Sequence, residues 1–368
     1  MAPWQLDAAM NAVMVLIAMR VLLLDSRRLA GGKTNGRAAI VTTLRNAGAG
    51  LDSFVAYHLA VGFEHIYLFF DDPADPDLPA LAANPLVSAI PCDTALRRAW
   101  MSLPGYSDQA DFVDVEVMAR QLLNVELAMT LARERGLGWL LHIDADELFY
   151  PNAESAAQHF AWLEGTGFFD TMTYRNHEAV PERDDIGDFF REVDLFKVPA
   201  DLRSEPITDE GRKLLQETPQ LQPRFFHFYN NGKSAVRLSA PDMQPKDVHA
   251  FFRPNGEHAG AQHTQHFILH YACCGFENFW MKYATLGRFS DQWWKKYDIG
   301  TLIGPVHLQA RDVVASGDRE AARDFYRQRI AIEDRPRIDA LLACGLLARF
   351  PQPRRILEAA GRAGGKLR

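Results

Sequence analysis

Short apolar runs that alternate with helical patterns predict an α/β fold. Residues 38–44 and 65–70 are rich in β-branched, aromatic and aliphatic side chains, which is typical of buried strands. Between them lie a glycine-containing turn and a helical pattern, in which Asp52 or Ser53 serves as the N-cap and Gly62 follows the end. Strand, turn, helix and strand in this order form the opening unit of a nucleotide-binding α/β sheet.

A long helix and a further strand are predicted next. Residues 111–135 carry apolar side chains at helical spacing, and the pattern ends at a Gly-Leu-Gly segment. Gln121 and Asn124 lie on the polar side of this helix, where they either reach a ligand site or are solvated. The apolar run that follows, residues 140–143, predicts a buried strand.

The acids that follow this strand are the main sign of a functional site. Asp144, Asp146 and Glu147 place three carboxyls in four residues at the carboxyl end of a strand, where open α/β sheets bind ligands. Like charges this close raise one another's pKa unless a cation lies between them, which favours a divalent ion with oxygen ligands. Mg²⁺ or Mn²⁺ fits, bound through one or two carboxylates and substrate phosphates. The alternative is a strand end that meets solvent through a few acids.

The pattern changes after Pro151. Residues 170–176 resemble a strand, and residues 224–229 and 234–238 flank an Asn-Asn-Gly-Lys sequence, which predicts a tight hairpin. Lys233 would project from the turn of this hairpin, where it either contacts a diphosphate or is an exposed turn lysine.

The second half of the chain is also rich in histidine and tryptophan. Its histidines between residues 249 and 270 are His249, His258, His263, His266 and His270. His270 closes an apolar run, so it stands at a strand end, where its imidazole either completes a metal shell or is a hydrogen-bonded structural group. No cysteine pair precedes these histidines, which argues against a dedicated zinc site. A helix is predicted to begin at Glu277, and Trp280, Trp293 and Trp294 suit either sugar rings or core packing.

Both ends of the chain differ from the middle. Residues 12–24 are apolar except for Arg20 and too short to span a bilayer, which predicts a helix packed on the main domain, with a membrane-surface anchor as the alternative. Beyond Gly304 the chain is helical and arginine-rich, typical of a solvated face or of contact with an anionic membrane. The predicted division is an N-terminal helix and linker at residues 1–36, a main domain at residues 37–300 with halves at 37–150 and 151–300, and a helical extension at residues 301–368.

Composition limits the classes of function and the cellular compartments that are expected for this chain. A net charge of −7 over 368 residues and a pI near 6.0 argue against a nucleic-acid-binding protein. Four cysteines without a disulfide or zinc pattern favour a reducing compartment, and the chain has no Asn-x-Ser/Thr glycosylation sequon. The chain is therefore expected to be cytoplasmic, with peripheral membrane contact as the variant.

A dinucleotide site is the first alternative for the opening unit. Gly48 and Gly50 begin a glycine fingerprint with Asp71 near the position of the ribose-binding acid. Ser53 stands where the third glycine belongs, which disfavours NAD or FAD. Asp71 or Asp72 would then hold the base or ribose of another nucleotide donor.

Five segments in order resemble glycosyltransferases of the GT-A fold, closest to the family 2-like and family 92-like enzymes. These segments are Leu-Arg-Asn at 44–46, Tyr-His-Leu-Ala-Val-Gly-Phe-Glu-His-Ile-Tyr at 57–67, the acidic stretch at 139–149, Asn-Gly-Lys-Ser-Ala-Val-Arg at 231–237, and His-Tyr at 270–271. The resemblance covers roughly residues 41–282. It implies a Rossmann-like nucleotide-sugar-binding mixed sheet flanked by helices, with residues 37–300 as the catalytic domain.

The resemblance also implies a site and its ligands. Asp144-Ala145-Asp146 would be the DXD motif, with Asp146 as the main ligand of Mn²⁺ or Mg²⁺, Asp144 as a ribose or metal contact and His270 as a further ligand. The ion would take up charge on the departing nucleoside diphosphate. Further donor contacts are expected at Arg45, Asn46, Asp71, Asp72 and Arg237. The implied activity is transfer of a hexosyl group from a nucleotide sugar, with a UDP-sugar favoured, to a carbohydrate, lipid-linked or other hydroxyl acceptor, as in polysaccharide biosynthesis.

The catalytic groups are less clearly marked. Lys233 would add positive charge at the diphosphate, and an inverting transfer also needs a carboxylate that accepts the acceptor's proton. Glu277 is the favoured base, with Glu178 and Glu257 as alternatives. At Ala47 the chain departs from the resembled pattern, which often has Glu after the Asn.

Two other functions compete with this interpretation. A haloacid-dehalogenase-like phosphatase uses a similar Asp-x-Asp motif, but its late Gly-Asp-x-x-x-Asp partner fails here, because Ala322 stands where the second acid is needed. A non-catalytic nucleotide-sugar-binding protein would keep the fold without turnover.

Overall fold

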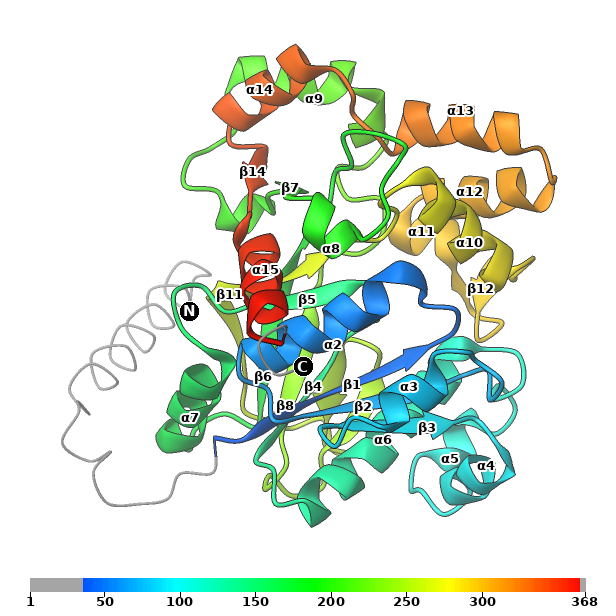
Figure 1. Ribbon diagram of the computed structural model, residues 1–368, viewed down its shortest axis with the longest axis vertical. Coiled ribbons are helices and arrows are strands. Elements are labelled where there is room, and N and C mark those ends of the chain that lie inside the picture. Colours follow the sequence, from blue (N-terminus) through cyan, green and yellow to red (C-terminus); the bar gives the residue numbers. More distant parts are fainter. Residues whose placement is uncertain (1–35, 365–368) are drawn as a thin grey trace, which may run out of the picture.

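The computed structural model of the chain describes residues 36–364 (Figure 1). The apolar segment predicted at residues 12–24 lies outside the described residues. Among the described residues, no helix is both long enough and apolar enough to cross a membrane.

Eight strands form one mixed sheet in the order β3-β2-β1-β4-β8-β6-β11-β5. The strands are β1 (Ala38–Leu44), β2 (His65–Phe70), β3 (Val87–Pro91), β4 (Trp139–His142), β5 (Glu147–Tyr150), β6 (Thr171–Glu178), β8 (Lys233–Arg237) and β11 (Gly260–His270). The first four strands in the chain pair in parallel, and β6 pairs in parallel with β11. The pairs β4–β8, β6–β8 and β5–β11 are antiparallel. The predicted α/β class is confirmed as a mixed α/β fold.

Helices cover both faces of the sheet, because both faces are apolar. Successive residues of a strand point to opposite faces, and in β1 Ile40 packs into one hydrophobic cluster while Ala39 packs into the other. The helices α2 (Leu51–Ala60) and α7 (Ala156–Thr166) contribute to the first cluster. The helices α4 (Thr94–Trp100) and α6 (Val117–Glu134) contribute to the second.

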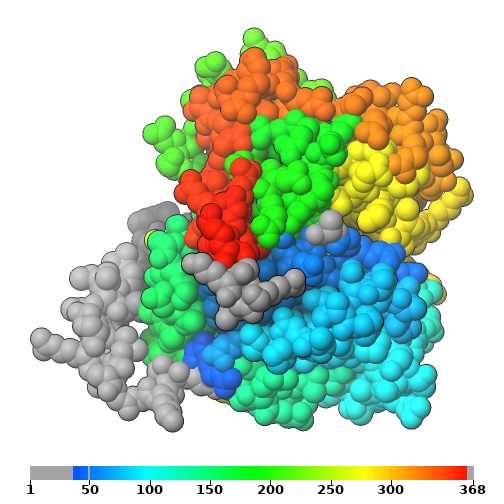
Figure 2. All heavy atoms as spheres, viewed as in Figure 1, coloured from blue at the N-terminus to red at the C-terminus, as the bar shows by residue number. Residues whose placement is uncertain are grey.

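Residues that follow β6 in the chain build two further apolar clusters outside the main sheet. The helices α10 (Phe276–Leu286), α12 (Val306–Ala315) and α13 (Arg319–Arg329) share one apolar cluster. A second cluster gathers around α9 (Asp209–Glu217), α14 (Arg335–Ala343) and the small sheet of β7 (Leu195–Lys197) and β14 (Leu347–Arg349). Finally α15 (Gln352–Gly364) returns to α2, as the red and blue surfaces in contact in Figure 2 show.

Short elements complete the fold. They are η1 (Gly48–Gly50), α3 (Leu78–Ala82), α5 (Tyr106–Gln109), α8 (Phe189–Glu192), η2 (Ala200–Leu202), η3 (Pro219–Leu221), β9 (Gln244–Asp247), β10 (Ala250–Phe252), β12 (Gln292–Trp293), β13 (Tyr297–Asp298) and α11 (Ile299–Ile303).

Two predicted elements differ in the structure. The long helix begins at Val117 instead of residue 111, because residues 110–115 form turns and Val115 points to solvent. The predicted hairpin at residues 224–238 is wrong: residues 224–229 form no strand, and β8 pairs with β4 and β6. The turn before β8 is instead held by Asn176 of β6, whose Oδ1 accepts the Gly232 N–H at 3.0 Å.

Candidate active site

A cleft of about 1780 Å³ opens where β1, β2 and β4 end. The residues that follow these strands, Arg45, Asp71 and Asp144, all line it. The carboxyl ends of neighbouring parallel strands meet at one edge of a sheet, so three segments far apart in the sequence converge here. The cleft therefore lies where the alternation of strands and helices predicts a ligand site.

Asp144 is held by groups from two neighbouring elements. Its Oδ2 lies 2.8 Å from the Nζ of Lys233 at the start of β8, and its Oδ1 accepts a hydrogen bond of 2.9 Å from Gln121 of α6. The Lys233 side chain is fully buried, and its Nζ also lies 3.7 Å from Glu147 Oε2. Lys233 thus links Asp144 to Glu147, the first residue of β5. Of the two alternatives left open for Gln121, solvation or contact with a site, the structure shows contact with Asp144 in the cleft.

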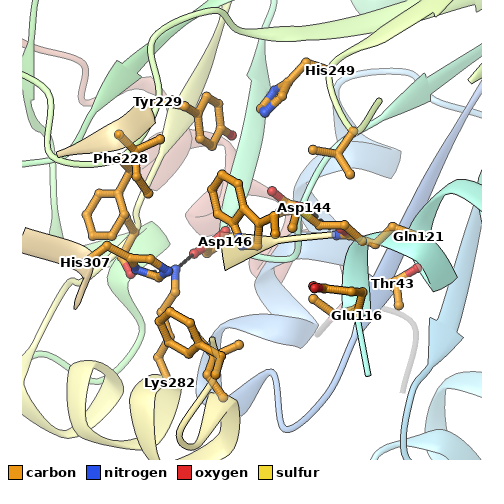
Figure 3. Close-up of a pocket in the computed structure, with 18 of the residues that line it drawn as sticks. Thr43, Glu116, Gln121, Asp144, Asp146, Phe228, Tyr229, His249, Lys282 and His307 are labelled. Carbon is orange, nitrogen blue, oxygen red and sulfur yellow. Dashed lines mark hydrogen bonds and ion pairs between the residues drawn. The ribbon is translucent and has the colours of Figure 1, made fainter. Parts of the chain in front are cut away.

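Asp146 is bound from the opposite side of the cleft. The Nζ of Lys282, from α10, donates hydrogen bonds to Asp146 Oδ2 at 2.7 Å and to the Ala272 carbonyl oxygen at 3.0 Å. His270 Nε2 lies 3.8 Å from the same Asp146 oxygen. Figure 3 shows Lys282 joined to Asp146, with Phe228 and His307 beside it and Asp144 and Gln121 on the other side.

These ion pairs set the charge states of the acids. Burial alone would raise the pKa of Asp144, but the charge of Lys233 holds it well below its ordinary value. Burial and Lys282 act in the same opposed way on Asp146, with a lowered pKa as the result. Burial dominates at Glu147 and raises its pKa well above the ordinary value. The acidic stretch therefore carries two negative charges matched by two ammonium groups.

An aromatic wall stands above the two aspartates (Figure 3). The ring of Tyr229 stacks on that of His270, with centroids 4.8 Å apart, and its centroid lies 4.5 Å from that of His249. His249 Nδ1 lies 2.8 Å from the Gly232 carbonyl oxygen. Burial lowers the pKa of His249 to about 3, so this imidazole is neutral at neutral pH.

The opposite rim is formed by the turn between β12 and β13. The Trp294 backbone N–H donates to Glu116 Oε1 at 3.1 Å, and its indole N–H donates to Gln109 Oε1 at 3.2 Å. Both Trp294 and Lys295 have positive φ angles, of 50° and 54°. The turn therefore ties the C-terminal half of the chain to the segment before α6.

The predicted donor-binding residues fall into two groups. Arg45, Asn46 and Asp71 line the cleft together with Asp144. Asp71 binds Arg120 through both oxygens, at 2.5 and 2.8 Å, which orients this arginine within the site wall. Asn46 has a φ of 50°, and its Nδ2 donates to Thr285 Oγ1 of α10 at 3.3 Å.

Two residues predicted to bind the donor lie elsewhere. Arg237 ends β8 at the opposite edge of the sheet, where it pairs with Asp170 at 3.2 Å. Asp72 accepts the Ala74 N–H within its own loop and does not line the cleft.

The predicted bases are also placed away from the cleft. Glu277 points to α13, where it binds Arg319 at 2.6 and 2.7 Å, because α10 turns this side of the helix away from the cleft. Glu178 is buried and pairs with Lys197 at 2.5 Å. Glu257 lies in an exposed loop beside Asn255.

These contacts do not fit a divalent ion at the predicted ligands. Both oxygens of Asp144 already accept hydrogen bonds, and an oxygen of Asp146 faces an ammonium group. Metal-binding histidines normally donate their second ring N–H to an acceptor, whereas Nδ1 of His270 is buried without a partner among the described residues. Binding of Mn²⁺ or Mg²⁺ at Asp144, Asp146 and His270 stays a prediction.

A separate histidine cluster lies between α7 and β11. Atoms of His159, His263 and His266 come within 4.8 Å of one another. The rings of His263 and His266 stack at 14°, so their in-plane lone pairs do not converge on a common point. His263 Nδ1 already accepts two backbone N–H groups, from Gln265 and His266. The cluster is explained by aromatic packing and hydrogen bonding.

The residue that sequence analysis missed is Lys282. It is separated from Asp146 by 136 residues, and nothing around it in the sequence marks it as part of a site. Phe228, Tyr229 and His307 were missed for the same reason, because the chain folds them onto the cleft from loops and from α12.

The fold and the site define an α/β protein with a ligand cleft at the carboxyl edge of its sheet, in which two acids are paired with two lysines. The sequence is similar to those of two curated glycosyltransferase-like proteins of Arabidopsis thaliana. The chain is 27% identical over 333 residues to "Glycosyltransferase-like At2g41451", covering 86% of this chain and 71% of the relative. It is 25% identical over 336 residues to "Glycosyltransferase-like At3g57200", covering 86% of this chain and 62% of the relative. These relatives support a glycosyltransferase in general.

Comparisons with family profiles and solved structures add little. No family profile matches the chain. The crystal structure of S. aureus TarS is similar with a TM-score of 0.31 and 12% identity, over 68% of this chain and 39% of that one. HddC from Yersinia pseudotuberculosis has a TM-score of 0.27 and 11% identity, over 66% of this chain and 96% of that one. Both TM-scores are too low to support an inference.

Proposed function

We propose that the chain is a glycosyltransferase of the GT-A type, which binds a nucleoside-diphosphate sugar in the cleft and transfers its hexosyl group to a hydroxyl acceptor. The observation that carries this proposal is the convergence of Asp144 and Asp146 with Lys233 and Lys282 at the carboxyl ends of β1, β2 and β4. Nucleotides bind at this edge in open α/β sheets. The glycosyltransferase-like relatives support the reaction class.

The charge distribution of the cleft supports an anionic ligand. The chain as a whole carries a net charge of −7, yet more cationic than acidic residues line the cleft. The cationic residues are Arg45, Arg120, Arg224, Lys233, Lys246, Lys282, Arg288, Lys295 and Lys296. A local positive surplus in a concave site attracts a diphosphate and orients it.

Different parts of the cleft are assigned to the nucleoside, the sugar and the acceptor. We assign the nucleoside to the part of the cleft beside Arg45, Asn46 and Asp71, where β1 and β2 end. Asp144, held by Lys233 and Gln121, faces the ribose from the centre of the site. The sugar and the acceptor then occupy the side lined by Tyr229 and Trp294, whose rings suit the flat faces of sugars.

Nucleotide-sugar hydrolysis gives a direct test of this proposal. Purified protein is incubated with UDP-glucose, UDP-galactose, UDP-N-acetylglucosamine and GDP-mannose, with MnCl₂ or with EDTA, and the released nucleoside diphosphate is measured. At least one donor is expected to be hydrolysed and to raise the melting temperature. Phosphatase activity on p-nitrophenyl phosphate without donor hydrolysis would establish the phosphatase alternative. UDP binding by calorimetry without turnover of any donor, with an acceptor panel present, would establish the non-catalytic alternative.

A further inference from the structure

The contacts that Lys282 makes within the protein leave part of its hydrogen-bonding capacity for a ligand. Its Nζ donates to Asp146 Oδ2 at 2.7 Å and to the Ala272 carbonyl oxygen at 3.0 Å, and it lies 5.5 Å from the ring centroid of Phe228. An ammonium group has three N–H donors, so these two bonds leave one for a ligand. Because Lys282 lines the cleft and its side chain is 28% exposed, a ligand there can reach this donor.

The ammonium charge is fixed in place by its surroundings. Two hydrogen-bond acceptors and the ring of Phe228, which faces the ammonium group, restrict a flexible side chain, which lowers the entropy cost of using it for binding. The carboxylate of Asp146 lies 2.7 Å from this ammonium group and pairs with its charge. Lys282 therefore presents a pre-oriented positive charge at the position where the DXD resemblance implies a divalent ion.

The neighbouring ion pair shows that this charge is not needed to balance Asp144. Asp144 has its own fully buried partner, Lys233, at 2.8 Å. With each aspartate already paired, a divalent ion on Asp146 would face the ammonium of Lys282 across a single carboxylate, and like charges at such distances repel strongly in a partly buried site.

We infer that Lys282 is a binding and catalytic cation of the proposed transferase: its ammonium group contacts the diphosphate of the donor and takes the role expected of a metal ion. This inference rests on the proposed function and names the group that acts on the leaving diphosphate at that same site. The donor class is a nucleoside-diphosphate sugar whose diphosphate is recognised without a divalent ion.

The chemical step follows from this contact. In donor hydrolysis the bond between the anomeric carbon and the β-phosphate oxygen breaks, and its electron pair stays on that oxygen. Water forms the new bond to the anomeric carbon and releases its proton to bulk solvent. The Lys282 ammonium donates a hydrogen bond to the phosphate oxygens as their charge grows, so it stabilises the transition state more than the ground state.

Calorimetric titration of UDP, GDP and inorganic pyrophosphate tests the inference. The wild-type protein is titrated in EDTA and in MnCl₂, beside Lys282→Met, Lys282→Arg and the control Lys213→Met, whose lysine also pairs with a carboxylate on a helix but lies outside the cleft. We expect the wild-type protein to bind a nucleoside diphosphate in EDTA within about twofold of its affinity in MnCl₂. Lys282→Met should weaken this binding at least tenfold, while Lys282→Arg keeps most of it and Lys213→Met changes nothing.

Each contrary result has a distinct meaning. If the wild-type protein binds nucleoside diphosphates only with MnCl₂, and Lys282→Met binds as tightly as the wild type, the inference is wrong and the proposed function stands. If the wild-type protein binds none of the probes in either buffer, the proposed function and the inference both fall. Should circular dichroism show that Lys282→Met is unfolded, Lys282→Gln replaces it, because the shorter amide side chain keeps a hydrogen-bond donor and carries no charge.

Discussion

Two lysine–carboxylate pairs differ in their relation to the cleft: one lies behind the residues that line it, and the other lines it directly. Lys197 and Glu178 lie 2.5 Å apart, and both side chains are 4% exposed. The oxygens of Glu178 also accept the backbone N–H groups of His227 and Phe228, so this pair is closed to any ligand. Lys282 and Asp146 lie at a similar distance of 2.7 Å but are 28% and 22% exposed and line the cleft.

The difference in exposure gives the two pairs different roles: one supports the backbone, and the other can contact a ligand. The Lys197–Glu178 pair fixes the backbone that presents Phe228 and Tyr229 to the cleft. Its two charges neutralise each other and are not available to a ligand. In the Lys282–Asp146 pair, two acceptors within the described residues bind the ammonium group, which leaves its third donor beside solvent. Carboxylate–lysine distance alone would not distinguish them, whereas exposure and the number of remaining partners do.

Removing Lys197 should have the largest effect on stability. Lys197→Met leaves Glu178 as an uncompensated buried charge, which costs about 3–5 kcal/mol of the free energy of unfolding. Urea denaturation of the variant measures this loss. Lys213→Met, at an exposed pair, should stay within about 0.5 kcal/mol of the wild type. A Lys197 variant as stable as the wild type would remove the distinction between the two pairs.

Asp146→Asn should act mainly on activity. The amide keeps the shape of the side chain but releases Lys282 from its charged anchor, so we expect donor hydrolysis to fall about 100-fold, equivalent to about 2.7 kcal/mol. The rate is measured with the donor that the wild-type protein hydrolyses. The melting temperature should drop less than that of Lys197→Met. Full activity of Asp146→Asn would contradict an active role for the pair.

Lowering the pH should reduce the free energy of unfolding through His227, which lies beside the Lys197–Glu178 pair. Burial and then the charge of Lys197 lower the pKa of this histidine to about 3. The unfolded chain takes up a proton below pH 6.5 and the folded chain does not, so stability is lost as the pH falls, by about 1.4 kcal/mol between pH 7.5 and 5.5. Urea denaturation at both pH values should show that His227→Gln reduces the pH dependence by this amount. An unchanged dependence would show that His227 is protonated in the folded state.

Glu277→Gln should have the smallest effect. The Glu277 side chain is 63% exposed, and its ion pair with Arg319 lies on the surface, so the free energy of unfolding should change by less than about 0.5 kcal/mol. Donor hydrolysis should remain at the wild-type rate. A collapse of activity with an unchanged melting temperature would return Glu277 to the role of base that the sequence first suggested.

The parallel half of the fold could be predicted closely from the sequence. β1 and β2 have the predicted bounds, because each is an apolar run that ends sharply at polar residues. β8 was predicted within one residue at each end, but its pairing was mispredicted, because an Asn-Gly turn between apolar runs normally forms a hairpin. Here Gly232 has a φ of 80°, and a Cβ on it would lie 2.0 Å from the Tyr174 carbonyl oxygen, so contact with β6 fixes the turn.

The site could be predicted only where its residues lie at strand ends on the edge of the sheet that forms the cleft. Asp144 and Asp146 lie in the cleft because they come directly after β4, and Lys233 lies there because it begins the neighbouring strand. Glu277 and Lys282 both lie on α10, and only the packing of that helix decides which of them faces the cleft. Sequence spacing within one helix does not supply that orientation.

The order of strands also has a consequence for the making of the protein. Asp144 and Asp146 leave the ribosome long before their counter-charges, since Lys233 follows Asp144 by 89 residues and Lys282 follows Asp146 by 136. A nascent chain or fragment that stops before β8 would carry the two acids side by side with neither lysine. The parallel half of the sheet therefore relies on lysines from the later part of the chain to pair with these two acids.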